Sequence, residues 1–121
     1  MKQVLPSAVV GTQLPHHRLD AYRVACELLV EVRRAGIRDP KLRDQAMRAA
    51  KGVACVTGEG VGRMSAADKA NRYSIARGEV LEVAIAVEIA WLAGDASEES
   101  SKQCNILADR VSAMLYRLAG R

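Results

Sequence analysis

Two adjacent histidines are the side chains with the clearest potential for chemistry in this 121-residue sequence. His16 and His17 follow Pro15, and no histidine occurs after them. Neighbouring residues point to different faces of a helix, and no cysteine or carboxylate stands at ligand spacing from the pair, so a metal site is not indicated. We interpret both histidines as a polar lead-in to the first helix.

Three cysteines, Cys26, Cys55 and Cys104, are the next candidates. Their odd number and the absence of any CxxC or cysteine/histidine spacing argue against a disulfide framework and against zinc. Cys26 and Cys104 recur with the apolar positions of two expected helices, and Cys55 lies between Ala54 and Val56. We therefore expect three small buried side chains, with a reactive thiol as the alternative. This pattern favours a reducing, cytoplasmic compartment.

Catalysis finds little support in the remaining motifs. A serine or cysteine nucleophile needs a base, and both histidines lie ahead of the first expected helix. The Glu-x-x-His motifs of dimetal helical bundles do not occur. The glycine-rich segment 58–62 follows a helical pattern and lacks the Lys-Ser/Thr ending of a phosphate-binding loop. We therefore expect no catalytic residues, no cofactor and no metal.

Charge is distributed unevenly along the chain, although the net charge is +4. Basic residues dominate between Arg33 and Arg77, whereas the segment from Glu79 to Glu99 contains acidic residues and no lysine or arginine. A basic stretch of this kind can form a phosphate-binding surface, or simply a solvated face. The candidate nucleic-acid-binding residues are Arg48, Lys51, Arg63, Lys69, Arg72 and Arg77. With one Trp, three Tyr and no Phe, such binding would rest on phosphates and would weaken with salt.

These residues must be positioned by helices, because apolar side chains recur every three or four residues and no strand-like alternation appears. Asp39-Pro40, Ser65 and Asp95 provide start signals, and glycines follow the expected helix ends. The expected helices span about residues 18–35, 40–59, 66–93 and 97–119. Their short connections predict an all-α, antiparallel up-and-down four-helix bundle over residues 18–121, preceded by an N-terminal arm of residues 1–17. The interrupted apolar stretch of this arm indicates neither a signal peptide nor a membrane span.

The third expected helix has two apolar faces. One face repeats at spacings of three and four through Tyr73, Ala76, Val80, Val83, Val87 and Ala90. Ile85, Ile89 and Leu92 form a second line on another face. Two apolar faces give this helix more apolar surface than the core of one bundle can cover. The apolar side chains of this sequence are small, so each helix has little apolar bulk to bury within one bundle. We infer that the C-terminal half of this helix contacts either a deep core or another subunit.

Several segments resemble a known family. They are Arg48-Ala49-Ala50, residues 59–63 (Glu-Gly-Val-Gly-Arg) and residues 75–78 (Ile-Ala-Arg-Gly) with Glu82. Their spacing is similar to that of the small bacterial four-helix-bundle proteins first described from reading frames inserted in large-subunit ribosomal RNA genes. The resemblance covers roughly residues 18–119. Residues 56–60 read Val-Thr-Gly-Glu-Gly where the family usually has Asn-Ile-Ala-Glu-Gly, and Gly78-Glu79 replaces the usual Gly-Ser.

The resemblance implies an up-and-down bundle that assembles into a ring-like homopentamer and has no known catalytic activity. Relatives include the accessory variability proteins of diversity-generating retroelements, which work with a reverse transcriptase and nucleic acid through a basic surface. Arg48, Glu59 and Glu82 match family positions, and we interpret them as a structural ion-pair network that holds the second and third helices together.

The function expected from these observations is that of a cytoplasmic, non-enzymatic, homo-oligomeric protein. We expect a pentamer that binds RNA or DNA as an accessory or scaffold. The alternative is an oligomeric protein–protein interaction module that binds no nucleic acid. In both cases the expected partners are further copies of the chain and either a nucleic acid or another protein, and no membrane.

Overall fold

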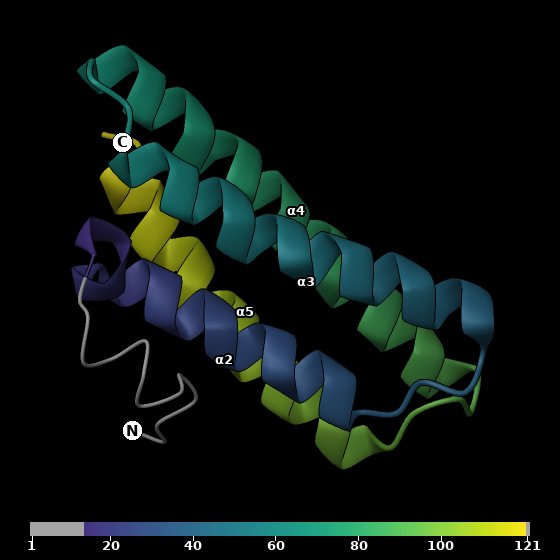
Figure 1. Cartoon of the computed structure of the whole chain (residues 1–121). Helices are drawn as coiled ribbons and strands as arrows, with labels where there is room; N and C mark the ends of the chain where they lie inside the picture. Colours follow the sequence, from purple (N-terminus) through teal and green to yellow (C-terminus); the bar gives the residue numbers. More distant parts are fainter. Residues whose placement is uncertain (1–13, 121) are drawn as a thin grey trace.

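Four antiparallel α-helices, joined by turns of a few residues, make up most of residues 14–120, which the computed structural model describes (Figure 1). A 3-10 turn, η1 (Pro15–Arg18), precedes α2 (Asp20–Arg34), α3 (Pro40–Val61), α4 (Ala66–Leu92) and α5 (Glu98–Leu118). No strand occurs within the described range. The predicted all-α, up-and-down bundle is therefore confirmed, and each helix begins and ends within two residues of its expected bounds. Residues 1–13 of the expected N-terminal arm lie outside the described residues.

Side-chain caps determine where three of the helices begin. Asp39 at the start of α3 and Ser65 at the start of α4 each accept a hydrogen bond from the amide three residues along, at 2.9 and 3.0 Å. Such bonds satisfy amides that have no partner within the helix. The start of α5 differs from the prediction, because its cap is Ser97, which accepts its bond at 3.0 Å, and Asp95 lies in the preceding turn.

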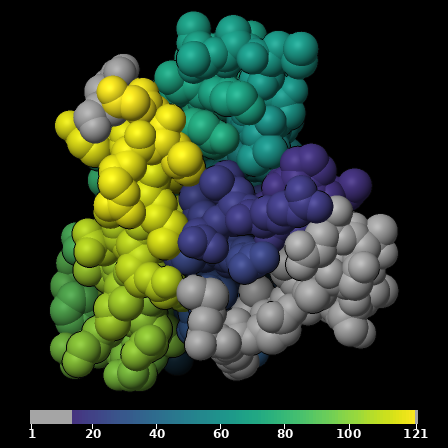
Figure 2. All heavy atoms as spheres, turned by 90° about the vertical axis from the view of Figure 1, so that its left-hand side faces the viewer, coloured from purple at the N-terminus to yellow at the C-terminus, as the bar shows by residue number. Residues whose placement is uncertain are grey.

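The two ends of the bundle are built differently. At one end, Gly36 and Gly94 terminate α2 and α4 in the left-handed conformation, with φ of 56° and 83°, which glycine adopts without steric cost. Arg38 ties these two turns together, because its amide donates to the Asp95 carbonyl at 3.0 Å and its guanidinium donates to the Gly94 carbonyl. At the other end, η1, the α3–α4 turn and the last turns of α5 gather (Figure 2).

The core is formed by alanine and valine with a few larger side chains, of which Leu28, Ile37 and Leu115 are fully buried. All six expected core positions of α4 are buried, so the predicted inner face is confirmed. The second apolar line of this helix, Ile85, Ile89 and Leu92, lies on the surface of the single chain. Within residues 14–120, no helix is both long and apolar enough to cross a membrane.

The glycine-rich segment that was expected to end α3 is helical up to Val61. Its glycines allow close packing instead of breaking the helix. A Cβ atom at Gly58 would lie 3.4 Å from the ring of Tyr22, and one at Gly60 would lie 2.6 Å from the ring of Tyr73. Gly60 therefore admits the Tyr73 ring against the α3 backbone, at a distance that no larger residue permits.

The three cysteines differ in exposure, which corrects the expectation that all are buried. Cys104 is buried and Cys26 is half-buried, but Cys55 is exposed. Cys55 follows two buried residues on α3 and therefore points away from the core, because apolar neighbours in sequence do not share one helix face. Burial, with a contribution from the carboxylate of Glu31, raises the pKa of Cys104 to about 12 and keeps this thiol neutral.

Candidate nucleic-acid interface

The outer face of α3 carries the clearest group of unobstructed cations. A shallow hollow of about 670 Å³ is lined by Lys41, Asp44, Gln45, Met47, Arg48 and Lys51. Arg48 and Lys51 stand three residues apart, so their side chains project from the same side of the helix. All three basic residues of the hollow are exposed, and Asp44 is the single acidic residue that lines it. The arrangement offers ammonium and guanidinium donors to an anion approaching from solvent.

Two of the predicted nucleic-acid-binding residues already have partners within the fold. The Lys69 ammonium donates to the carbonyl of Val61 at 2.8 Å and to that of Gly60 at 3.4 Å. It therefore neutralises the carboxyl end of α3, where a helix favours a cation. The Arg72 guanidinium lies 3.9 Å from a carboxylate oxygen of Glu59. Both side chains are half-buried and stabilise the α3–α4 connection.

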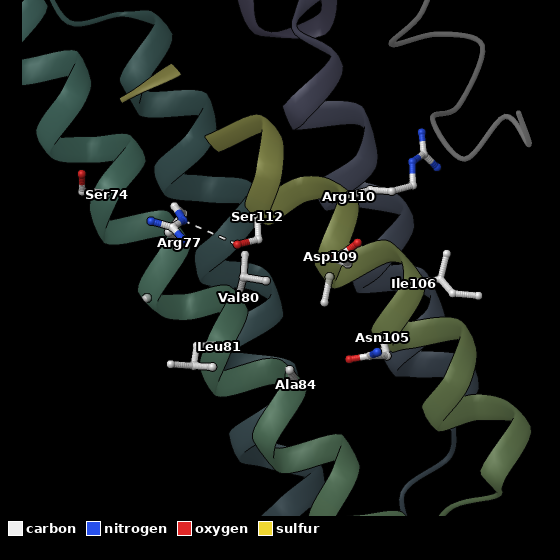
Figure 3. Close-up of a pocket in the computed structure, with 12 residues that line it drawn as sticks. Ser74, Arg77, Val80, Leu81, Ala84, Asn105, Ile106, Asp109, Arg110 and Ser112 are labelled. Carbon is white, nitrogen blue, oxygen red and sulfur yellow. Dashed lines mark hydrogen bonds between the residues drawn. The ribbon is translucent and has the colours of Figure 1, made fainter. Parts of the chain in front are cut away.

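Arg63 and Arg77 lie apart from the α3 hollow. Arg63 is exposed in the turn between α3 and α4. Arg77 projects from α4 toward α5, where its Nε donates to Ser112 Oγ over a long 3.5 Å (Figure 3). Its guanidinium carbon lies 4.8 Å from the ring centre of Tyr116. The six residues proposed from sequence thus occupy three places in the fold and do not form a single patch.

The residues of the expected ion-pair network are likewise divided between two places. Arg48 and Glu59 both lie on α3, eleven positions and about 16 Å apart along the helix axis. Glu59 pairs with Arg72, as described above. Glu82 and Arg48 instead both influence the Glu79 carboxyl, and they shift its pKa in opposite directions.

Glu79 is a partly buried ionisable residue that the sequence analysis did not identify. Its carboxyl packs against the backbone of α3 at Gly52, where an added Cβ atom would lie 3.0 Å from Oε2. Burial raises the pKa of Glu79, the nearby Glu82 carboxyl raises it further through charge and a hydrogen bond, and the Arg48 guanidinium opposes the shift. The departure from the family's usual Gly-Ser at positions 78–79 was the signal that could have identified it.

The histidines at the N-terminal end serve a structural purpose. His17 is buried, and its Nδ1 accepts a hydrogen bond from the Leu14 amide at 3.0 Å. His16 packs edge-on against the ring of Tyr22 with ring centres 4.9 Å apart. Among residues 14–120, no group of three or more histidine, cysteine or acidic side chains is arranged to hold a metal ion.

Comparison with known proteins places this fold in a family. The model of one family, described as 23S rRNA-intervening sequence protein, matches residues 17–117. The match begins at the third residue of η1 and ends in the last turn of α5, so it includes all four helices of the bundle. A comparison with curated proteins gave no match. The chain therefore belongs to the family of 23S rRNA-intervening sequence proteins.

Proposed function

We propose that this protein is a non-enzymatic, homo-oligomeric bundle that binds RNA or DNA as an accessory or scaffold. The observation that carries the proposal is the hollow on α3, where Lys41, Arg48 and Lys51 are exposed beside a single acidic residue. Within residues 14–120 none of these three cations forms an ion pair within 4 Å, although Arg48 also acts on the nearby Glu79 carboxyl. They therefore remain available to phosphates, whereas the Lys69 ammonium is held by carbonyls at the end of α3. The net charge of +4 adds a favourable long-range field.

Phosphate contacts of this kind have a measurable signature. Each contact releases counterions, so the logarithm of the binding constant falls linearly with the logarithm of the salt concentration. Three contacts give a slope of about −2.7 on duplex DNA and of about −2 on a single strand. The affinity is therefore expected to be appreciable at low salt and to weaken steeply toward physiological salt.

Fluorescence anisotropy with labelled RNA and DNA tests the proposal directly. Because the family description refers to an intervening sequence of 23S rRNA, the first probe is a fragment of such RNA. The other two probes are an unrelated RNA hairpin and a DNA duplex. We expect saturable binding at low salt. Absence of binding to all three probes, or an affinity that is independent of salt, would reject the nucleic-acid function.

Self-association is the second part of the proposal, and it is supported by the outer face of α4. Ile85, Ile89 and Leu92 are 46%, 46% and 69% exposed and lie one helical turn apart. Removing these side chains from water provides a driving force for contact with another copy. Five copies is the number that the family resemblance implies.

Light scattering tests the assembly independently of nucleic acid. At micromolar concentration we expect a mass of about five times 13.1 kDa for the unmodified chain. Replacing Ile89 and Leu92 by serine should lower this mass. The matched control is Leu118→Ser on α5, which removes one exposed leucine from another helix and should leave the mass unchanged. A monomeric mass for the unmodified chain would contradict the assembly.

The same apolar face favours a second candidate function, that of an oligomeric protein–protein interaction module. An exposed apolar line on one helix suits a protein partner as well as another copy of the chain. This function requires oligomer formation without binding of any of the three nucleic-acid probes, so the two measurements together separate the candidates.

A further inference from the structure

A groove between α4 and α5 has a composition that the α3 hollow lacks. It measures about 670 Å³, which lies within the size range of small-ligand sites. Figure 3 shows that Arg77 from α4 and Ser112 from α5 reach toward each other across it, and that Asn105 points from α5 toward α4. Val80 and Leu81 contribute apolar surface to the lining. The groove therefore combines a cation, neutral hydrogen-bonding groups and an apolar wall.

The cation at this groove lies over an aromatic ring. The Arg77 guanidinium lies 4.8 Å from the centre of the Tyr116 ring, and its Nε is directed at Ser112 Oγ. Tyr116 is 45% exposed, so the pair stands at the surface. Both a tyrosine ring and a guanidinium plane are surfaces on which nucleobases stack, and the Nη groups of an arginine also donate to phosphate oxygens.

The groove is lined by two basic residues and one acidic residue, Arg77, Arg110 and Asp109. Arg110 points away from the groove in Figure 3. Arg77 is therefore the cation that reaches across the groove and can meet a phosphate there.

We propose that the Arg77–Tyr116 pair and the adjoining groove receive an unpaired nucleotide, so that the protein prefers single-stranded over double-stranded nucleic acid. In a duplex, both faces of each base are covered by its neighbours, and only phosphates remain accessible to this pair. In a single strand, one base stacks on the guanidinium–tyrosine pair while the adjacent phosphate meets the Nη groups of Arg77. The inference rests on the proposed nucleic-acid function and adds the class of strand.

The groove is compatible with the proposed oligomer. It is lined by the middle of α4, from Ser74 to Ala84, and the exposed line assigned to self-association begins at Ile85, one turn after the exposed Leu81 of the groove. Nucleotide binding and subunit contact therefore use consecutive parts of one helix.

The test compares a labelled single strand with the duplex of the same sequence by anisotropy at one low salt concentration. The variants are Tyr116→Leu, which removes the ring, Tyr116→Phe, which keeps it, and Arg77→Lys, which keeps the charge but removes the guanidinium plane. Arg117→Gln is the matched control, because it removes an exposed charge from the same turn of α5 without removing the ring. Circular dichroism verifies that each variant is folded.

We expect the unmodified chain to bind the single strand more tightly than the duplex. Tyr116→Leu should lower single-strand affinity by about 5- to 150-fold, the range for loss of one stacked base, and leave duplex affinity unchanged. Arg77→Lys should act in the same direction, and Tyr116→Phe and Arg117→Gln should retain the preference.

Four other outcomes overturn the inference, and they can be told apart. Equal affinity for both strands, or a preference that survives Tyr116→Leu, removes the inference and leaves the proposed function standing. Loss of binding to every nucleic acid by the unmodified chain removes both. A Tyr116→Leu variant that changes the oligomer mass instead of the strand preference shows that the groove is a protein contact.

Discussion

Gly60 and Thr57, two buried residues on α3, occupy positions where a single atom decides the packing. Gly60 faces Tyr73, a residue that is itself buried. Thr57 is fully buried, and its hydroxyl has no hydrogen-bond partner among the described residues. The buried hydroxyl therefore places a polar atom in an otherwise apolar core. Both positions give predictions about stability.

A Gly60→Ala substitution tests the contact with Tyr73. The added Cβ atom would lie 2.6 Å from the ring, so the ring or the helix must shift, and we expect a loss of about 1–3 kcal/mol in the free energy of unfolding. Gly78→Ala is the control, because no atom lies within 4 Å of its Cβ position. That change should instead stabilise α4 by about 0.5–1 kcal/mol. Urea unfolding followed by circular dichroism measures both, and equal effects would contradict the packing argument.

A Thr57→Val substitution tests the unpartnered hydroxyl. Valine has nearly the same shape and removes the buried polar atom, so we expect the free energy of unfolding to rise by about 1 kcal/mol. Thr57→Ala also removes a methyl group and leaves a cavity, so this variant should be less stable than Thr57→Val. The expectation fails if Thr57→Val is less stable than the unmodified chain, since the hydroxyl would then have a partner.

At the scale of helices, capping and close approach determine how the elements meet. Ser97 begins α5, and the carboxyl of Glu79 on α4 packs against α3 at Gly52. The first feature fixes a helix boundary, and the second places an ionisable group between two packed helices. Each can be tested by one substitution with a matched control.

The cap of α5 is tested by comparing Ser97→Ala with Asp95→Ala. Because Ser97 accepts the hydrogen bond from the Ser100 amide, its replacement should cost about 1 kcal/mol of stability. Asp95→Ala leaves this bond in place, and also the backbone carbonyl that accepts from Arg38. The Asp95 variant should therefore unfold at nearly the same urea concentration as the unmodified chain. A larger loss of stability for Asp95→Ala than for Ser97→Ala would show that Asp95, as predicted from sequence, caps α5.

The stability of the α3–α4 contact should depend on pH through Glu79. The pKa of Glu79 in the folded chain is raised, mainly by burial and further by Glu82. Ionisation of Glu79 therefore lowers the stability of the fold, and protonation restores it. Stability should therefore fall as the pH rises from the ordinary carboxyl value of 4.5 through the raised pKa. Glu79→Gln should unfold at a higher temperature than the unmodified chain at pH 7.

The advantage of Glu79→Gln should shrink as the pH falls and disappear below pH 4.5, where the Glu79 carboxyl is protonated in both states. Glu88→Gln, at an exposed position on the same helix, is the control. Thermal unfolding of the three proteins between pH 4 and pH 8 measures the difference. A difference that does not vary with pH would show that Glu79 is not the responsible group.

The helices could be predicted from sequence far better than the contacts between them. Caps such as Asp39 and Ser65, together with apolar spacing, are local signals and gave the element bounds. The close packing at Gly60 depends on Tyr73 of another helix, and the exposure of Cys55 depends on which way α3 faces. Likewise, the partners of Lys69 and Glu79 lie on a neighbouring helix or at its end. These features are set by helix rotation and distance, which a one-dimensional pattern does not contain.

For the whole molecule, the placement of charge matters more than its total. The sequence places six basic residues in one stretch, but the fold uses Lys69 and Arg72 internally and separates Arg77 from the α3 hollow. Arg48 and Lys51, with Lys41, remain together on one open surface. If the protein binds nucleic acid as we propose, this surface should account for most of the change in binding constant with salt concentration.

The most direct test of this central claim is the salt dependence of duplex binding for two double variants with the same loss of charge. Arg48→Gln/Lys51→Gln removes two cations from the α3 hollow, and Lys102→Gln/Arg117→Gln removes two exposed cations from α5. In plots of log binding constant against log salt, we predict that the α3 variant lowers the magnitude of the slope by about 1.8, two contacts at about 0.9 each. The α5 variant should retain the slope of the unmodified chain. Identical slopes for the two double variants would contradict the assignment of phosphate binding to α3.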